Sequence, residues 1–145
     1  MNTFHKTSFV LFSIIALLMI ATGATYLTAP TIMPYHLAAM ETTWQGLSQG
    51  MQNMSVNFMK SVSAGFLSSG LAVLILLAVP FRKGETWSVF AIFALVLTQV
   101  GIIATRTYDV SVNTMANPPL FPLLAVLVLA VIGFVLALFK KPTLR

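Results

Sequence analysis

The sequence lacks cysteine, and only 8% of its 145 residues are charged. Without cysteine the chain cannot perform disulfide exchange or thiolate catalysis, and it cannot hold a metal or an iron–sulfur cluster through thiolates. In ordinary soluble domains about 25% of residues are charged. The shortage of charge therefore argues against a soluble globular enzyme and against a disordered tail.

Several motifs with known chemistry are also missing. The chain has no glycine-rich phosphate loop, no zinc-protease helix motif and no nucleophile elbow. Its two histidines, His5 and His36, lie at opposite ends of the first apolar run, so they cannot pair as haem ligands. Small proton-coupled multidrug carriers require an acid inside a membrane span, whereas no acid lies inside an apolar run of this sequence. The sequence thus identifies no catalytic residue and predicts no cofactor.

Apolar residues are present in excess. They make up 58% of the chain, and the mean hydropathy is +0.93. A helix that rises about 1.5 Å per residue needs about 20 residues to cross a hydrocarbon core about 30 Å thick. Four charge-free stretches reach this length: Ser8–Thr28, Ser61–Phe81, Thr86–Thr105 and Pro119–Phe139.

These runs predict an all-α integral membrane four-helix bundle, because backbone groups in lipid must be paired within the helix. The runs do not alternate as the strands of a β-barrel do. One alternative concerns the first run, since Lys6 before it and Thr22-Gly23-Ala24 within it resemble a signal peptide with a cleavage site. The run through Leu27 is longer than the usual apolar region of a signal peptide, which favours an uncleaved helix.

The basic residues predict the topology. The net charge of +5 lies beside apolar runs, which indicates membrane orientation rather than a nucleic-acid partner. By the positive-inside rule both termini and the loop Arg82–Thr86 are expected in the cytoplasm, with membrane lipids as partners. One side carries six basic residues and the other side two: Lys6, Arg82, Lys83, Lys140, Lys141 and Arg145 against Lys60 and Arg106.

The segment between the first two runs predicts an additional amphipathic helix on the outer face, over about Tyr35–Met59. Its apolar residues recur at alternating intervals of three and four, which is the helical period. They are Leu37, Met40, Trp44, Leu47, Met51, Met54 and Phe58. We expect this helix to lie over the outer mouth of the bundle or along the lipid interface, with bends at Gly46 and Gly50.

The same spacing continues into the second run with small residues, at Ser61, Gly65, Ser68 and Ala72. Small residues at these intervals allow helix backbones to approach closely. The pattern predicts that the second membrane helix packs along this face. A homo-oligomer or a larger membrane complex built through this face is a further prediction.

Polar residues gather at the expected outer boundary and give the candidate ligand-binding residues. They are His36, Glu41, Trp44, Gln99, Arg106 and Asp109. His36 and Glu41 are five positions apart, so on one helix they point about 140° apart, which argues against a dedicated acid–base or metal pair. Gln99 is the most polar residue inside a run, and an amide at that depth bonds a neighbouring helix or lines a cavity.

The methionines suggest an alternative role. Thioethers bind copper(I), and His36 can assist them, so copper(I) binding on the outer face is an alternative hypothesis. Adaptable packing in the amphipathic segment explains some of these residues without a metal. Six of the eight methionines lie outside in this topology: Met33, Met40, Met51, Met54, Met59 and Met115.

The motifs Met33-Pro34-Tyr35-His36, Trp44, Pro80-Phe81-Arg82-Lys83-Gly84-Glu85-Thr86-Trp87 and the last helix that begins at Pro118 form a recognisable pattern. The pattern resembles a family of small four-span bacterial membrane proteins to which no activity is assigned. This resemblance implies a bacterial cytoplasmic (inner) membrane setting. We expect a non-enzymatic protein, either an accessory subunit or a binder of lipid or another apolar molecule. The alternative is a membrane-embedded enzyme or transporter that uses the outer polar cluster.

Overall fold

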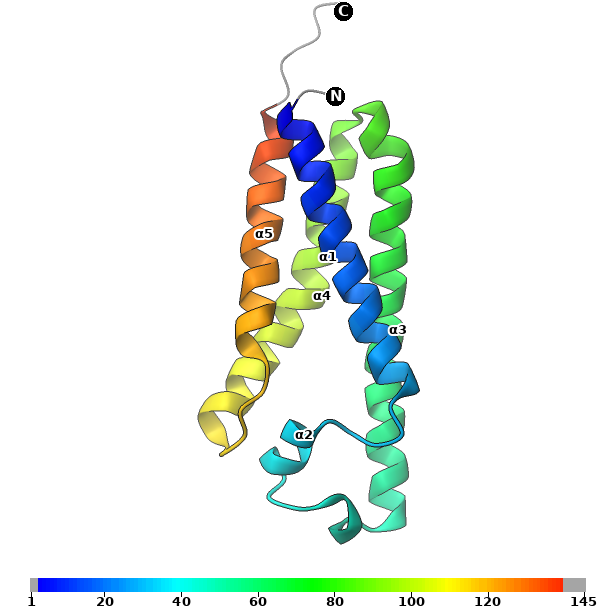
Figure 1. Ribbon diagram of the computed structural model, residues 1–145, viewed down its shortest axis with the longest axis vertical. Coiled ribbons are helices and arrows are strands. Elements are labelled where there is room, and N and C mark those ends of the chain that lie inside the picture. The colour runs from blue at the N-terminus through cyan, green and yellow to red at the C-terminus, as the bar shows by residue number, and fades with distance from the viewer. Residues whose placement is uncertain (1–2, 140–145) are drawn as a thin grey trace, which may run out of the picture.

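The computed structural model describes residues 3–139, and within this range it contains helices and no strand. The four long helical segments are long and apolar enough to cross a membrane. They stand side by side in Figure 1 and alternate in direction along the chain. Their bounds are α1 (Thr3–Thr28), α3 (Gln49–Leu76) continued by the π-helical turn η2 (Leu77–Phe81), α4 (Thr86–Asn113) and α5 (Leu120–Leu138). The all-helical prediction is confirmed.

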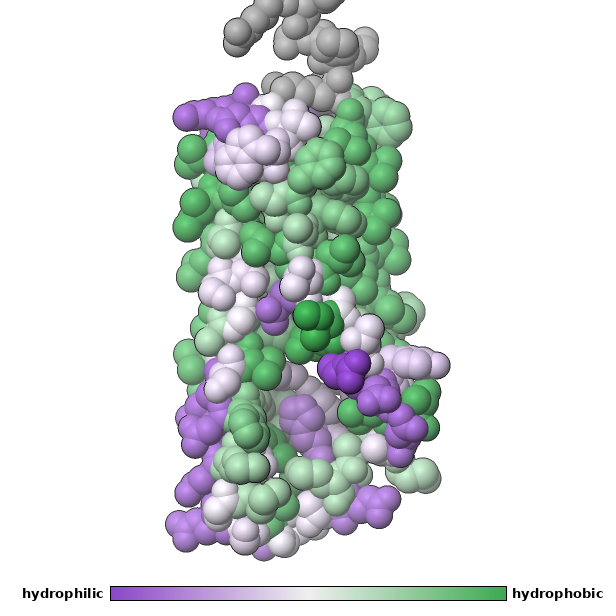
Figure 2. Space-filling model, turned by 180° about the vertical axis from the view of Figure 1, so that it is seen from behind, coloured by the Kyte–Doolittle hydropathy of each residue, from purple (hydrophilic) through white to green (hydrophobic). Residues whose placement is uncertain are grey.

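The outward surface of these helices is apolar along most of their length. Leu71, Ile75, Phe90 and Val128, which lie on three of the four long helices, are more than half exposed. Figure 2 shows this as a broad apolar band, with polar residues concentrated toward the two ends of the molecule. Large apolar side chains that face outward in such number need lipid rather than water around them. The four helices therefore indicate a multi-pass membrane protein.

The core is centred on α1, which packs against both α3 and α5. Phe12 and Ile15 are fully buried there, and the hydroxyl of Ser8 donates to the carbonyl oxygen of Gly133 at 2.6 Å. α1 and α3 approach each other closely at Gly70. A Cβ at this position would lie 2.7 Å from Cγ1 of Ile20 and 3.0 Å from the backbone oxygen of Ala16.

The small residues predicted to form the packing face of the second membrane helix are distributed differently. Ser61 and Ser68 are exposed, and Ala72 is half-buried. Gly65 faces α4, because a Cβ there would lie 3.1 Å from Oε1 of Gln99. The face that meets α1 instead carries Gly70, since burial in this bundle follows where the neighbouring helices lie rather than an extension of the outer periodicity.

The end of the bundle that holds both termini is closed by a short turn between α3 and α4. Gly84 has a φ of 77°, in the left-handed region that glycine adopts without a steric penalty. Near this turn, His5 of α1 is buried and its ring stacks on Phe81 at 4.1 Å between centroids. Nε2 of His5 also lies 2.9 Å from the carbonyl oxygen of Phe81, which fixes α1 to the end of η2.

The other end differs from the predicted single amphipathic helix. The segment forms the short helix α2 (Pro34–Ala39) and the 3-10 turn η1 (Trp44–Gly46) before α3 begins at Gln49. The helical conformation ends after α2, where Glu41 has a φ of 51°. Thr43 accepts a hydrogen bond from the backbone N of Gly46, and Ser48 accepts one from that of Met51. Such caps start new helices, so they override the apolar periodicity.

The C-terminal part of the predicted amphipathic segment forms the first turns of α3. The helix from Gln49 to Phe81 has 33 residues. At about 1.5 Å per residue it is about 50 Å long, well beyond a hydrocarbon core about 30 Å thick. Its first turns therefore project past the other helices, and Figure 1 shows α2 beside them at the same end.

Candidate functional site

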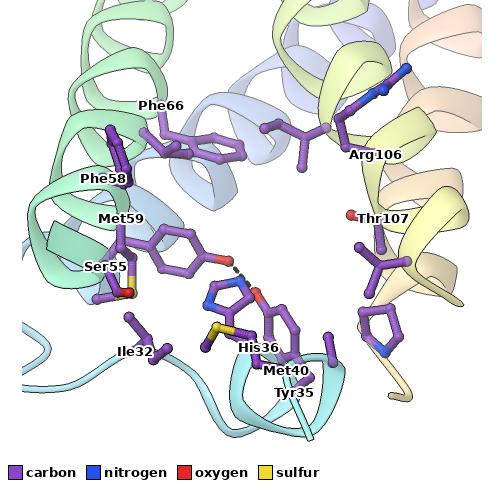
Figure 3. Close-up of a pocket in the computed structure, with 16 residues that line it drawn as sticks. Ile32, Tyr35, His36, Met40, Ser55, Phe58, Met59, Phe66, Arg106 and Thr107 are labelled. Carbon is purple, nitrogen blue, oxygen red and sulfur yellow. Dashed lines mark hydrogen bonds between the residues drawn. The ribbon is translucent and has the colours of Figure 1, made fainter. Parts of the chain in front are cut away.

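A cavity of about 420 Å³ lies at the projecting end of the bundle, where α1, α2, α3 and α4 meet. Figure 2 shows a hollow in the lower part of the face that is turned away from the viewer in Figure 1. Figure 3 shows the cavity with its lining side chains. The lining residues are Tyr26, Ile32, Tyr35, His36, Ala39, Met40, Ser55, Phe58, Met59, Val62, Phe66, Ile103, Arg106, Thr107, Val110 and Pro118.

The walls are apolar, and several are aromatic rings. Tyr26 on α1 makes edge-to-face contacts with Phe66 of α3 at 6.4 Å and with His36 of α2 at 6.5 Å. His36 also contacts the ring of Tyr35 at 4.3 Å. These contacts lie within the usual range for aromatic pairs, so they hold three helices around one space.

One side of the cavity carries the hydroxyl groups of Tyr26 and Tyr35 and the imidazole of His36. The hydroxyl groups of Tyr26 and Tyr35 are hydrogen-bonded to each other. Burial, with the contribution of Tyr26, raises the pKa of Tyr35, so its hydroxyl stays protonated. Burial lowers the pKa of His36, because the apolar surroundings disfavour the charged imidazolium. This side of the cavity is therefore uncharged at neutral pH.

Two neighbours on α4 contribute differently to the opposite wall. Arg106 is exposed, and in Figure 3 its guanidinium group leads away from the cavity, so its carbon stem forms the wall. Thr107 is half-buried, and its hydroxyl group points toward the cavity. The cavity thus has hydroxyl groups on two opposed sides and apolar walls between them.

Of the six candidate ligand-binding residues, the structure brings His36 and Arg106 to the lining of this cavity. Glu41 is exposed at the left-handed position after α2. Asp109 is also exposed, and its carboxylate oxygen Oδ1 accepts a hydrogen bond from Nδ2 of Asn113 at 2.9 Å. Both acids are absent from the lining residues, so the predicted polar cluster is not assembled around one cavity.

Two further candidates have other positions. Trp44 is half-buried in η1, and its backbone oxygen accepts a hydrogen bond from Nε2 of Gln52 at 2.7 Å. Gln99 is half-buried against Gly65, between α3 and α4 and outside the lining of the cavity. The Gln99 side chain therefore contributes to the contact between α3 and α4.

Sequence reasoning missed three lining residues that shape the cavity, namely Tyr26, Phe66 and Thr107. Tyr26 lies near the end of α1, where an aromatic side chain at a membrane boundary is common and carries no specific signal. Phe66 lies inside an apolar run, where it cannot be distinguished from packing. Thr107 is adjacent to Arg106, which was identified from the sequence, but the sequence does not reveal which of the two side chains points into the cavity.

Some of the methionines predicted to lie outside the membrane line the cavity, and the others do not. Met40 and Met59 line the cavity together with His36. Within residues 3–139, no cluster of three or more His, Asp or Glu side chains could hold a metal ion. The remaining outer methionines are not among the lining residues: Met33, Met51, Met54 and Met115.

Comparisons of this chain with protein-family models, with curated proteins and with solved structures found no match.

Proposed function

We propose that this chain is a non-enzymatic membrane protein that binds an apolar small molecule, or the apolar part of a lipid, in the outer cavity. The observation that carries the proposal is the cavity itself, with a volume of about 420 Å³ and walls of aromatic and aliphatic side chains. Small-molecule sites are typically mostly apolar cavities of about 300–1,000 Å³ with a few placed polar groups. An accessory role in a larger complex or a homo-oligomer is compatible with this activity.

The arrangement of titratable groups supports binding over catalysis. An enzyme of the outer face would need an acid and a base within reach of one substrate. Glu41 and Asp109 do not line the cavity, and the guanidinium of Arg106 leads away from it. The groups that do face the cavity are hydroxyls and a neutral imidazole.

We propose a bacterial cytoplasmic membrane location, with both termini in the cytoplasm. Figure 1 places the start of α1, the α3–α4 turn and the end of α5 at the same end of the bundle. That end carries Lys6, Arg82 and Lys83, whereas the cavity end carries Lys60 and Arg106. The predicted basic residues Lys140, Lys141 and Arg145 lie outside the described range. The positive-inside rule then places the cavity on the outer side.

Native mass spectrometry of protein released gently from membranes tests the proposal. Wild type is expected to retain one apolar molecule, while Thr107→Phe, which projects a ring into the cavity of the ligand, should not. Thr105→Phe is the matched control, because Thr105 is exposed on the same helix and its hydroxyl bonds to Ile102 within that helix. Retention of the same molecule by wild type and Thr107→Phe, or by none of the three proteins, would contradict the proposal.

Copper(I) binding is a second candidate, because Met40, Met59 and His36 line the same cavity. Thioether and imidazole ligands together suit this soft cation. Competition with a copper(I) chelator should then show loss of binding in a Met40→Leu, Met59→Leu double variant. Met115→Leu is the control, since Met115 is 91% exposed. Equal binding by the double variant and wild type would remove this candidate.

A further inference from the structure

The paired tyrosines leave one hydrogen-bond donor for a ligand. Tyr26 and Tyr35 each carry one O–H, and their mutual hydrogen bond uses one of the two protons. The hydroxyl that accepts in this pair keeps its own proton for a further acceptor. Both residues line the cavity, so this proton can be donated to a molecule bound there.

The cavity also lacks a charged group to receive a charged ligand. Among the described residues that line it, none carries a carboxylate, and Arg106 is the only formally charged one. Figure 3 shows the guanidinium of Arg106 leading away from the cavity. His36 beside the tyrosines is half-buried and offers a ring N–H or a ring nitrogen. A neutral ligand with hydrogen-bond acceptors fits these groups better than an anionic lipid headgroup does.

The positions of the donors indicate where the acceptors of the ligand lie. Tyr35 and His36 face the cavity from α2, and the Thr107 hydroxyl faces it from the opposite wall on α4. Phe66 and the ring of Tyr26 contact each other and add aromatic walls to the cavity. A flat ring with an acceptor oxygen at each end matches this arrangement, because aromatic walls favour stacked or edge contacts with a flat ring.

We infer that the outer cavity binds the head of a membrane quinone, which is a neutral ring with two opposed carbonyl oxygens and an apolar chain. One carbonyl accepts from the remaining O–H of the tyrosine pair, and the other accepts from Thr107. The chain leaves over the exposed residues Phe58 and Val62 of α3 toward lipid. The inference concerns binding and involves no electron transfer. It rests on the proposed function, of which it names the ligand class.

Calorimetric titration of the full chain in detergent with two probes tests the inference. The probes are a decyl-substituted benzoquinone and decylbenzene, which has the same chain on a flat six-membered carbon ring but no carbonyl. A hydrogen bond of ordinary strength changes affinity by about three- to tenfold. Wild type is therefore expected to bind the quinone at least about tenfold more tightly than decylbenzene.

Variants locate the two donors. Thr107→Val keeps the shape of the side chain and removes its hydroxyl, so the quinone affinity should fall about three- to tenfold. A single Tyr→Phe change leaves one tyrosine hydroxyl for the ligand, whereas the Tyr26→Phe, Tyr35→Phe double variant removes both and should weaken binding by a similar factor. Tyr108→Phe is the control, since Tyr108 is exposed on α4 and does not line the cavity. Thr107→Val and Tyr108→Phe should not alter decylbenzene binding, and the double variant should weaken quinone binding more than decylbenzene binding.

The outcomes separate this inference from the proposal beneath it. Equal affinity of wild type for both probes, or quinone affinity unchanged in both Thr107→Val and the double variant, would overturn the quinone inference and leave apolar binding standing. Failure of wild type to bind either probe would overturn both.

Discussion

The hydroxyl groups of Tyr26 in α1 and Tyr35 in α2 are hydrogen-bonded to each other across the projecting end of the bundle. Helix α2 has six residues, which is too short for a helix to be stable alone in water. Its position therefore depends on contacts with the long helices, and this bond together with the ring contacts of His36 supplies them. Because α2 forms one wall of the cavity, the same bond determines whether the cavity is closed on that side.

Removal of the tyrosine bond is predicted to loosen α2 without unfolding the bundle. Tyr35→Phe should lower the stability of the docked α2 by about 0.5–1.5 kcal/mol, the usual net contribution of one hydrogen bond. Hydrogen–deuterium exchange of the peptide that contains α2 should be correspondingly faster. Tyr108→Phe, on the exposed face of α4, should leave this exchange unchanged. Equal protection of α2 in Tyr35→Phe and wild type would show that the bond does not hold the helix.

A second prediction concerns the contact of α1 with α3. Gly70→Ala places a Cβ 3.0 Å from the backbone oxygen of Ala16, which cannot move aside as a side chain can. We expect a destabilisation of about 1–3 kcal/mol, typical of overpacking in a core. The matched control is Gly50→Ala in the same helix, because nothing lies within 4 Å of its added Cβ. Thermal denaturation in detergent should rank Gly70→Ala lowest, and a ranking with Gly50→Ala below it would contradict this packing.

The pKa of His36 gives a pH dependence. Burial lowers this pKa below its ordinary value of 6.5, so between the two values the unfolded chain is protonated at His36 and the folded chain is not. Protons then favour the unfolded state, and stability falls as the pH decreases below about 6.5. The Tm should drop between pH 7.5 and pH 5, and less so in His36→Gln. Both proteins retain His5, so an identical drop of the Tm in wild type and in His36→Gln would show that His36 does not cause it.

The cysteine-free chain allows a direct test of orientation. Gln45→Cys lies in η1 at the cavity end, and Thr86→Cys lies at the start of α4 at the other end, with both positions exposed. A membrane-impermeant maleimide should label Gln45→Cys in intact cells. It should label Thr86→Cys only after the membrane is opened. The reverse pattern would place the cavity in the cytoplasm.

The long helices could be predicted from the sequence because their signal is one of composition and length. Apolar runs of about 20 residues have few alternatives in lipid, and the predicted runs lie in the observed helices to within a residue at Pro119 and Phe139. The division of the predicted amphipathic helix into α2, η1 and the start of α3 could not be predicted from apolar spacing. That spacing continues through Trp44, whereas local caps end one helix and start the next. Thr43 and Ser48 are the residues that carried that signal.

The site was predicted less completely because its residues come from distant parts of the chain. His36 and Arg106 were identified by their polarity at a membrane boundary. Tyr26 acquires its role by meeting Tyr35 across a loop, and Phe66 acquires its role by meeting Tyr26. No spacing along the chain predicts these contacts, since they depend on how α1, α2 and α3 pack.

Photolabelling with an apolar diazirine probe in native membranes tests most directly whether the outer cavity holds an apolar ligand. Adducts are predicted to concentrate on cavity residues such as Met40 and Met59, and to decrease when excess unlabelled decylbenzene is added. Labelling of lipid-facing residues such as Val128 should not respond to this competitor. Adducts spread evenly over the lipid-facing surface, with none that can be competed from the cavity, would contradict the account.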